Sequence, residues 1–180
     1  MPRSLPVTTG LPLSVGLRDC SQDAKNASAL VNHSLANYVF GDFAKAVGDA
    51  EKALNYCEDQ RLSSFVVTAK MNLGYFIAEA HFHDRRHFGL EHALRAKKLI
   101  QEALANVPAE KKAKYLDTYG AVEIACGETE AEIRAGLASC QEALSLARVN
   151  HRDSPLVLRV AEAFYKLHEH RAFRRLIDLD

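Results

Sequence analysis

The segment 41–54, GDFAKAVGDAEKAL, carries the pattern that decides the fold. Its apolar and small residues recur at spacings of three and four, which is the periodicity of one face of an α-helix. These residues are Phe43, Ala46, Val47, Ala50, Ala53 and Leu54. Half of them are alanine, and two glycines in the segment add no side chain at all. The pattern predicts an amphipathic helix whose apolar face is small.

The same pattern returns twice further along the chain. The stretches at 46–54, 96–104 and 136–144 read AVGDAEKAL, AKKLIQEAL and GLASCQEAL. Each begins with a small residue, has alanine seven positions later and ends in leucine. Self-similarity of this kind is typical of a solenoid built from helical hairpins.

Helical periodicity covers almost the whole chain from Asp23 onward, and strand-like alternation is absent. Several breaks carry helix-terminus signals, such as the Thr-x-x-Glu capping box at Thr129 and Glu132 and the Ser154-Pro155 pair. The predicted helices form four pairs, 23–39 with 43–57, 63–83 with 88–106, 109–126 with 130–148, and 155–168 with 171–178. The organisation is therefore a helical domain at 23–180, preceded by a flexible or extended tail at 1–22. A short transit peptide is the alternative for that tail.

Length and composition narrow the classes of function. The 180 residues suffice for one core, and 23 basic residues balance 23 acidic ones, which argues against a nucleic-acid-binding protein. No apolar run approaches the roughly 18 residues of a membrane helix, so we expect no membrane partner. The four cysteines form no Cys-x-x-Cys pair, which favours a reducing, cytoplasmic compartment.

The repeated pattern resembles the tetratricopeptide repeat (TPR) family. The resemblance rests on the small positions of the second helices, on a turn glycine at Gly41, on the first-helix stretch NLGY at 72–75, on Ser34 and Gly120, and on Pro108. It implies an all-α, right-handed superhelix of antiparallel helical hairpins, in which small residues stand where neighbouring helices cross closely. The spacing between the two small positions of a repeat is 12, 22 and 16 residues in the three repeats. The family value is 12, so the second and third repeats carry insertions, and the fourth pair is predicted to be a divergent C-terminal hairpin.

The resemblance also implies a function, which is to bind a protein or peptide partner in a concave groove lined by the first helices. Adaptors, assembly factors and chaperones work in this way. The groove residues that it implies are Asn32, Leu35, Tyr38, Met71, Asn72, Tyr75, Lys114 and Thr118. Exposure is expected at Glu79 and Ala121 as well. The alternative for the apolar members, such as Met71, is that they belong to the core.

One TPR subclass holds a terminal carboxylate of its peptide with asparagine, lysine and arginine side chains. Asn32, Asn72 and Lys114 match that pattern, whereas Ser28 and Thr118 stand where cationic residues would be. A carboxylate needs such cationic donors. We therefore expect no carboxylate clamp.

The stretch 81–92, HFHDRRHFGLEH, leaves a second class of function open. His83 and His87 lie four residues apart, so a continuous helix would place them on one face, where they could ligate a metal with Asp84. An enzyme or sensor using this tip is one alternative, and a self-associating structural domain of a larger protein is another. No catalytic motif is present, so we expect no enzyme activity, no cofactor and no metal, and homo-oligomerisation stays open.

Overall fold

The computed structural model describes residues 27–59, 63–107, 109–152 and 154–179. Within these residues the protein is all-α, with seven helices and no strand, as the periodicity predicts. The helices are α2 (Ala27–Val39), α3 (Phe43–Asp59), α4 (Ser63–His83), α5 (Leu90–Ala105), α6 (Ala109–Cys126), α7 (Glu130–Asn150) and α8 (Pro155–Ile177). The tail predicted at 1–22 lies outside the described residues. None of the described helices is long and apolar enough to cross a membrane.

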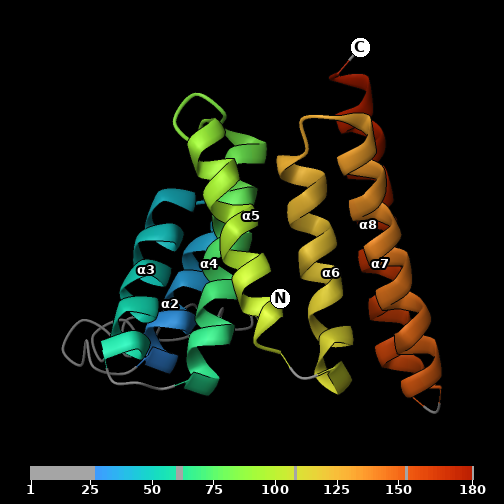
Figure 1. Cartoon of the computed structure of the whole chain (residues 1–180), viewed down its shortest axis with the longest axis horizontal. Coiled ribbons are helices and arrows are strands. Elements are labelled where there is room, and N and C mark those ends of the chain that lie inside the picture. The colour runs from blue at the N-terminus through green and yellow to red at the C-terminus, as the bar shows by residue number, and fades with distance from the viewer. Residues whose placement is uncertain (1–26, 60–62, 108, 153, 180) are drawn as a thin grey trace, which may run out of the picture.

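The helices form the hairpins α2–α3, α4–α5 and α6–α7, which stand side by side, and α8 packs at the far end of the molecule (Figure 1). The helices α2, α4, α6 and α8, which we call the first helices, each contact the next first helix along the chain. The second helices α3, α5 and α7 each contact the helix before and the helix after them. The first helices therefore make a continuous row, and the second helices cover one side of it.

The C-terminal hairpin predicted at 155–168 and 171–178 is wrong, because α8 runs through both segments as one helix. The two residues at the expected turn are Glu169 and His170, and neither is a glycine or proline that would end a helix. His168 and Ala172 flank this point and are both buried, at 2% and 1% exposed. Packing on either side of the expected break thus favours a continuous helix.

The predicted helix starts are mostly confirmed. The Thr129 side chain accepts a hydrogen bond from the Glu132 main-chain N–H, and the Glu132 side chain accepts one from the Thr129 N–H, so the capping box is complete. Pro155 begins α8, although the Ser154 side chain makes no capping hydrogen bond. Gly41 has a positive φ of 79°, a conformation that favours glycine at the turn between α2 and α3.

Small residues allow the helices of a hairpin to approach closely. Ala46, Ala96 and Gly136 are buried, and both alanines are fully inaccessible at 0% exposed. The closest approach is between α6 and α7. A Cβ atom added to Gly120 would lie 2.5 Å from the Gly136 carbonyl oxygen and would also overlap the sulfur of Cys140. Neither helix has room for one more carbon atom at this crossing.

Replacing Gly120 by alanine tests this close approach. Gly120→Ala should lower the free energy of unfolding by roughly 1–3 kcal/mol, because the two helix backbones would have to separate. Gly48 is the matched control, since it lies in α3 and a Cβ added there meets nothing within 4 Å. Gly48→Ala should raise the free energy of unfolding by about 0.5–1 kcal/mol, because alanine is the better helix former. Urea denaturation measures both, and equal effects at the two positions would contradict the assigned crossing.

Candidate functional site

The eight residues predicted to line a groove all lie on first helices. Three are on α2, three on α4 and two on α6, and these helices contact one another in that order. The residues are Asn32, Leu35, Tyr38, Met71, Asn72, Tyr75, Lys114 and Thr118. The side chain of Lys114 is outside those that the structure describes. The structure thus distributes the set along one row, and the side chains differ in what they can offer a partner.

Four of these side chains are open to a ligand. Asn32 is exposed, Leu35 is 50% exposed, and Asn72 and Thr118 are half-buried. Among the described residues, neither asparagine side chain has a hydrogen-bond partner. Both amides therefore keep their donors and acceptors free for another molecule.

Other expected positions turn out to be buried. Met71 is 2% exposed and packs in the main core, which confirms the core alternative for this side chain. Glu79 and Ala121, expected at the surface, are 1% and 4% exposed. Each of these residues lies on a first helix as predicted, but its side chain faces neighbouring helices and not solvent. A first helix in the middle of the row is packed on several sides, so such positions are buried.

Tyr38 and Tyr75 belong to a hydrogen-bonded network around the buried Glu79 carboxylate. The Tyr38 hydroxyl donates to Glu79 Oε2 at 3.0 Å and lies 3.2 Å from the Tyr75 hydroxyl. The guanidinium of Arg171, from α8, donates to Glu79 through two nitrogens, at 2.5 Å to Oε1 and 3.0 Å to Oε2. Arg171 also lies over the ring of Phe82, 5.4 Å from its centroid. The network joins α2, α4 and α8, and it occupies the two tyrosines that were predicted to contact a ligand.

This arrangement compensates a charge that would otherwise be costly to bury. Desolvation by burial lowers the pKa of Arg171, but the charge and hydrogen bonds of Glu79 outweigh it, so the pKa of Arg171 is raised overall. Burial also raises the pKa of Tyr38, so its hydroxyl remains protonated and able to donate. The bidentate geometry is the strong form of this ion pair. The network therefore has a structural role in holding α8 against α4.

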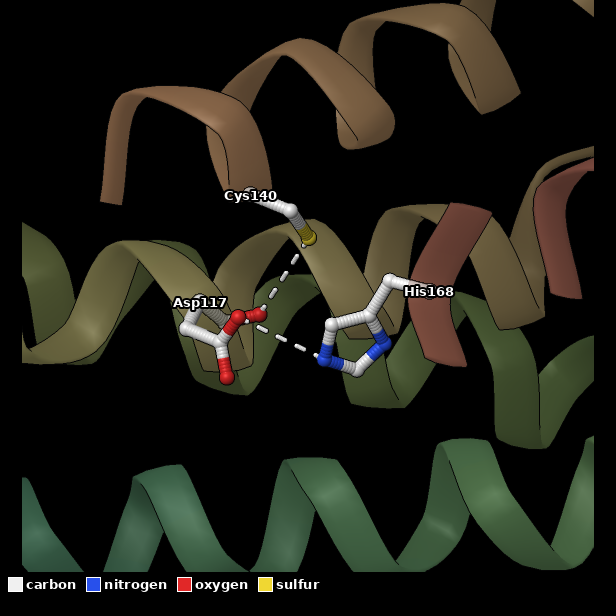
Figure 2. Close-up of side chains that lie close together, drawn as sticks. All are labelled: Asp117, Cys140 and His168. Atoms are coloured by element: carbon white, nitrogen blue, oxygen red, sulfur yellow. Dashed lines mark hydrogen bonds and ion pairs between the residues drawn. The ribbon is translucent and has the colours of Figure 1, made fainter. Parts of the chain in front are cut away.

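The described part of the chain brings together one group of three side chains of the kinds that ligate metals. They are Asp117, Cys140 and His168. They come from α6, α7 and α8, and Figure 2 shows the three side chains turned toward one another. His168 Nε2 lies 3.4 Å from Asp117 Oδ1, and the Cys140 thiol donates to the Asp117 main-chain oxygen at 3.8 Å. His168 is 2% exposed, and within the described residues neither of its ring nitrogens makes a hydrogen bond of good geometry. The sequence did not point to this cluster, since its members are 23 and 28 residues apart on separate helices.

The chemistry of the cluster suits packing better than metal binding. Nitrogen, oxygen and sulfur donors match the preferences of zinc, but zinc binds its ligands at about 2.0–2.3 Å and needs them closely gathered. The candidate ligand atoms all lie within 4.8 Å of one another. Burial raises the pKa of Cys140 to about 12, so the sulfur is a neutral thiol at pH 7, and its proton is already donated to a carbonyl.

The histidine-rich tip does not assemble a metal site in the described structure. Helix α4 ends at His83, so His83 and His87 do not share a helix face as the spacing suggested. His87 Nδ1 lies 2.6 Å from Asp84 Oδ2, and His81 Nδ1 lies 2.6 Å from the Phe88 carbonyl oxygen. The ring of His83 stacks on Phe43 at 5.0 Å. Each of these imidazoles has a separate local partner.

Comparisons with known proteins add no relative from which a function could be transferred. Scans against protein-family models, curated proteins and solved structures each return no match for this chain.

Breaking the Glu79–Arg171 pair should be costly. Glu79→Gln leaves the largely buried guanidinium without its countercharge and should lower the free energy of unfolding by roughly 3–5 kcal/mol. The control is Glu162→Gln, which removes the partner of Arg148 in an exposed pair and should cost less than about 1 kcal/mol. Thermal and urea denaturation measure both. If the two variants unfold alike, Glu79 does not hold α8 in place.

Metal analysis tests the assignment of the Asp117–Cys140–His168 cluster. Protein purified without chelators should hold no stoichiometric zinc, nickel or iron, because the Cys140 thiol donates to a main-chain carbonyl and the histidines of the tip have separate partners. Elemental analysis by plasma mass spectrometry is the measurement. One bound equivalent that disappears in Cys140→Ser would reverse the assignment, and one that disappears in a His83→Gln, His87→Gln variant would place the metal at the tip.

Proposed function

We propose that this protein is a TPR-like interaction module that binds a peptide segment or a helix of a partner protein on the face of its first helices. The observation that carries the proposal is the pair of unpartnered amides, Asn32 on α2 and Asn72 on α4, on two contacting helices, with the half-exposed Leu35 one turn from Asn32. In this proposal the protein serves as an adaptor, assembly factor or chaperone and not as an enzyme.

The packing order supports the TPR-like part of the proposal. The first helices contact one another, and each second helix packs between successive first helices. Hairpin repeats that stack into a solenoid have this arrangement. The buried small residues at Ala46, Ala96 and Gly136 stand at matching places in three successive second helices. A stack of this kind curves and offers an extended surface to a partner.

The chemistry of the open residues supports the binding part. A side-chain amide both donates and accepts, so it can pair with the main chain of an extended peptide and set its register. Leu35 adds apolar contact next to Asn32. The cationic donors of a carboxylate clamp are replaced by Ser28 and Thr118, so recognition would use the main chain of the partner and not its terminal carboxylate. The described cysteines Cys57, Cys126 and Cys140 are buried and unpaired, which suits a reducing compartment such as the cytoplasm.

Asn72→Ala tests the proposed binding face. Losing a hydrogen bond in a partly desolvated contact costs about 1–3 kcal/mol, so affinity for a partner identified by pull-down should fall about tenfold. The melting temperature should stay nearly unchanged, since the Asn72 amide has no hydrogen-bond partner among the described residues. Calorimetric titration measures the affinity, and amidating the C-terminus of the partner should have little effect.

Asn55→Ala is the matched control, because Asn55 is exposed on the second helix α3 and should leave affinity unchanged. Full affinity in both Asn72→Ala and Leu35→Ala would show that the binding face lies elsewhere on the molecule.

A further inference from the structure

Helix α8 carries an exposed apolar stripe. Leu156, Val160, Phe164 and Leu167 are 73%, 47%, 47% and 42% exposed. Their spacings of four, four and three place them on one face of the helix. Exposed apolar residues scattered singly need no explanation, but a stripe of four on one helix face is the pattern of a surface that packs against another element.

The stripe faces the same side of the molecule as the row of first helices. Arg171 follows Leu167 by four residues, so it continues the same helix face, and its guanidinium reaches Glu79 on α4. The residues that directly follow stripe positions, such as Tyr165 and His168, pack toward the protein, with the His168 ring stacked on Phe164 at 6.4 Å. The stripe therefore lies at the α8 end of the proposed binding face.

The opposite edge of the stripe is basic. Arg159, Lys166, His170 and Arg174 are all exposed and recur at spacings of seven, four and four along one side of α8. None of their side chains forms an ion pair within the described structure, whereas Arg148 and Glu162 nearby do pair with each other. Helix α8 has two acidic residues, Glu162 and Glu169, and Glu162 is paired with Arg148, so Arg159, Lys166 and Arg174 leave a local excess of positive charge along the helix.

We propose that the α8 face binds an amphipathic helix of a partner protein whose apolar stripe is flanked by acidic residues. The apolar stripe supplies the buried contact area, and the unpaired basic row selects a partner of negative charge. This inference rests on the proposed function and names the class of partner that it takes.

Two other occupants fit the charges less well. Antiparallel pairing of two copies across their stripes would bring each basic row against the same row of the other copy, and like charges repel. The chain's own segment 1–22 carries Arg3 and Arg18 against the single acid Asp19, so it does not supply the missing negative charge. An acidic helix of a partner satisfies both the stripe and the row.

Two synthetic probe peptides of about 20 residues, roughly 30 Å long as helices, test the proposal with the full chain. Both have leucine at helical spacings on one face, and the flanking positions hold glutamate in one peptide and lysine in the other. Fluorescence anisotropy should show that the glutamate peptide binds at least about tenfold more tightly than the lysine peptide. That preference should shrink as salt rises from about 50 to about 300 mM, because the charges are exposed. Equal binding of the two peptides would overturn the proposal.

Variants then assign the binding to α8. Phe164→Asp should abolish binding of the glutamate peptide, and Arg159→Glu with Lys166→Glu should reverse the preference toward the lysine peptide. Val149→Asp, at a 70% exposed apolar residue of α7, is the control and should bind as the parent does. Circular dichroism checks that each variant is folded, and the charge reversal remains decisive if Phe164→Asp is not.

Three outcomes would contradict the inference. Binding that survives Phe164→Asp would place the peptide elsewhere, and unchanged preference in the charge-reversed variant would remove the role of the basic row. A concentration-dependent dimer of the parent that Phe164→Asp dissociates, seen by light scattering, would assign the face to a second copy. In each case a tenfold loss of natural-partner affinity in Asn72→Ala would still support the proposed function, so the two proposals fail separately.

Discussion

The architecture depends on how closely neighbouring helices can approach. At the crossing of α6 and α7, glycine faces glycine, and a single added Cβ would meet the opposite backbone. At the corresponding places in α3 and α5 the residues are alanines with no accessible surface. Packing at such short distances brings many atoms into contact along the whole helix, and the dispersion gained there does not require large side chains. The small residues thus set the hairpin geometry, and larger residues such as Ile77 and Ile100 fill the main core around them.

A second constraint acts across the stack. Glu79 is buried in α4, and its countercharge comes from a residue 92 positions later. No backbone contact joins α4 and α8 in the described structure, so a long side chain bridges a gap that helix packing leaves. The pair also explains why Tyr38 and Tyr75 are held in place, since the Tyr38 hydroxyl donates to the Glu79 carboxylate and the Tyr75 hydroxyl lies 3.2 Å from that of Tyr38. Charge compensation thereby orders the face on which we propose that partners bind.

Local sequence signals predicted the helices well, because caps, prolines and apolar spacing act within a few residues. The capping box at Thr129 and the small positions in three second helices are of this kind. The prediction of a break after His168 was wrong for a nonlocal reason. His168 and Ala172 make contacts with other helices, and these contacts keep α8 continuous. The burial of Met71 and Glu79 likewise depends on neighbours that no single-helix pattern reveals. The Asp117–Cys140–His168 cluster lies beyond such reasoning altogether, because three helices have to be in place before its members meet.

The Glu79–Arg171 bridge also limits how this chain can evolve. Proteins built from stacked hairpins commonly gain or lose repeats by duplication, because each hairpin contacts only its neighbours. Packed helices lie about 8–10 Å apart, so a hairpin inserted between α5 and α6 would carry Arg171 well beyond the reach of Glu79. Both charges would then be left without their partner, and the insertion would be destabilising however well the new hairpin packed. The ion pair therefore keeps the number of hairpins between α4 and α8 constant, because only the present spacing lets Arg171 reach Glu79.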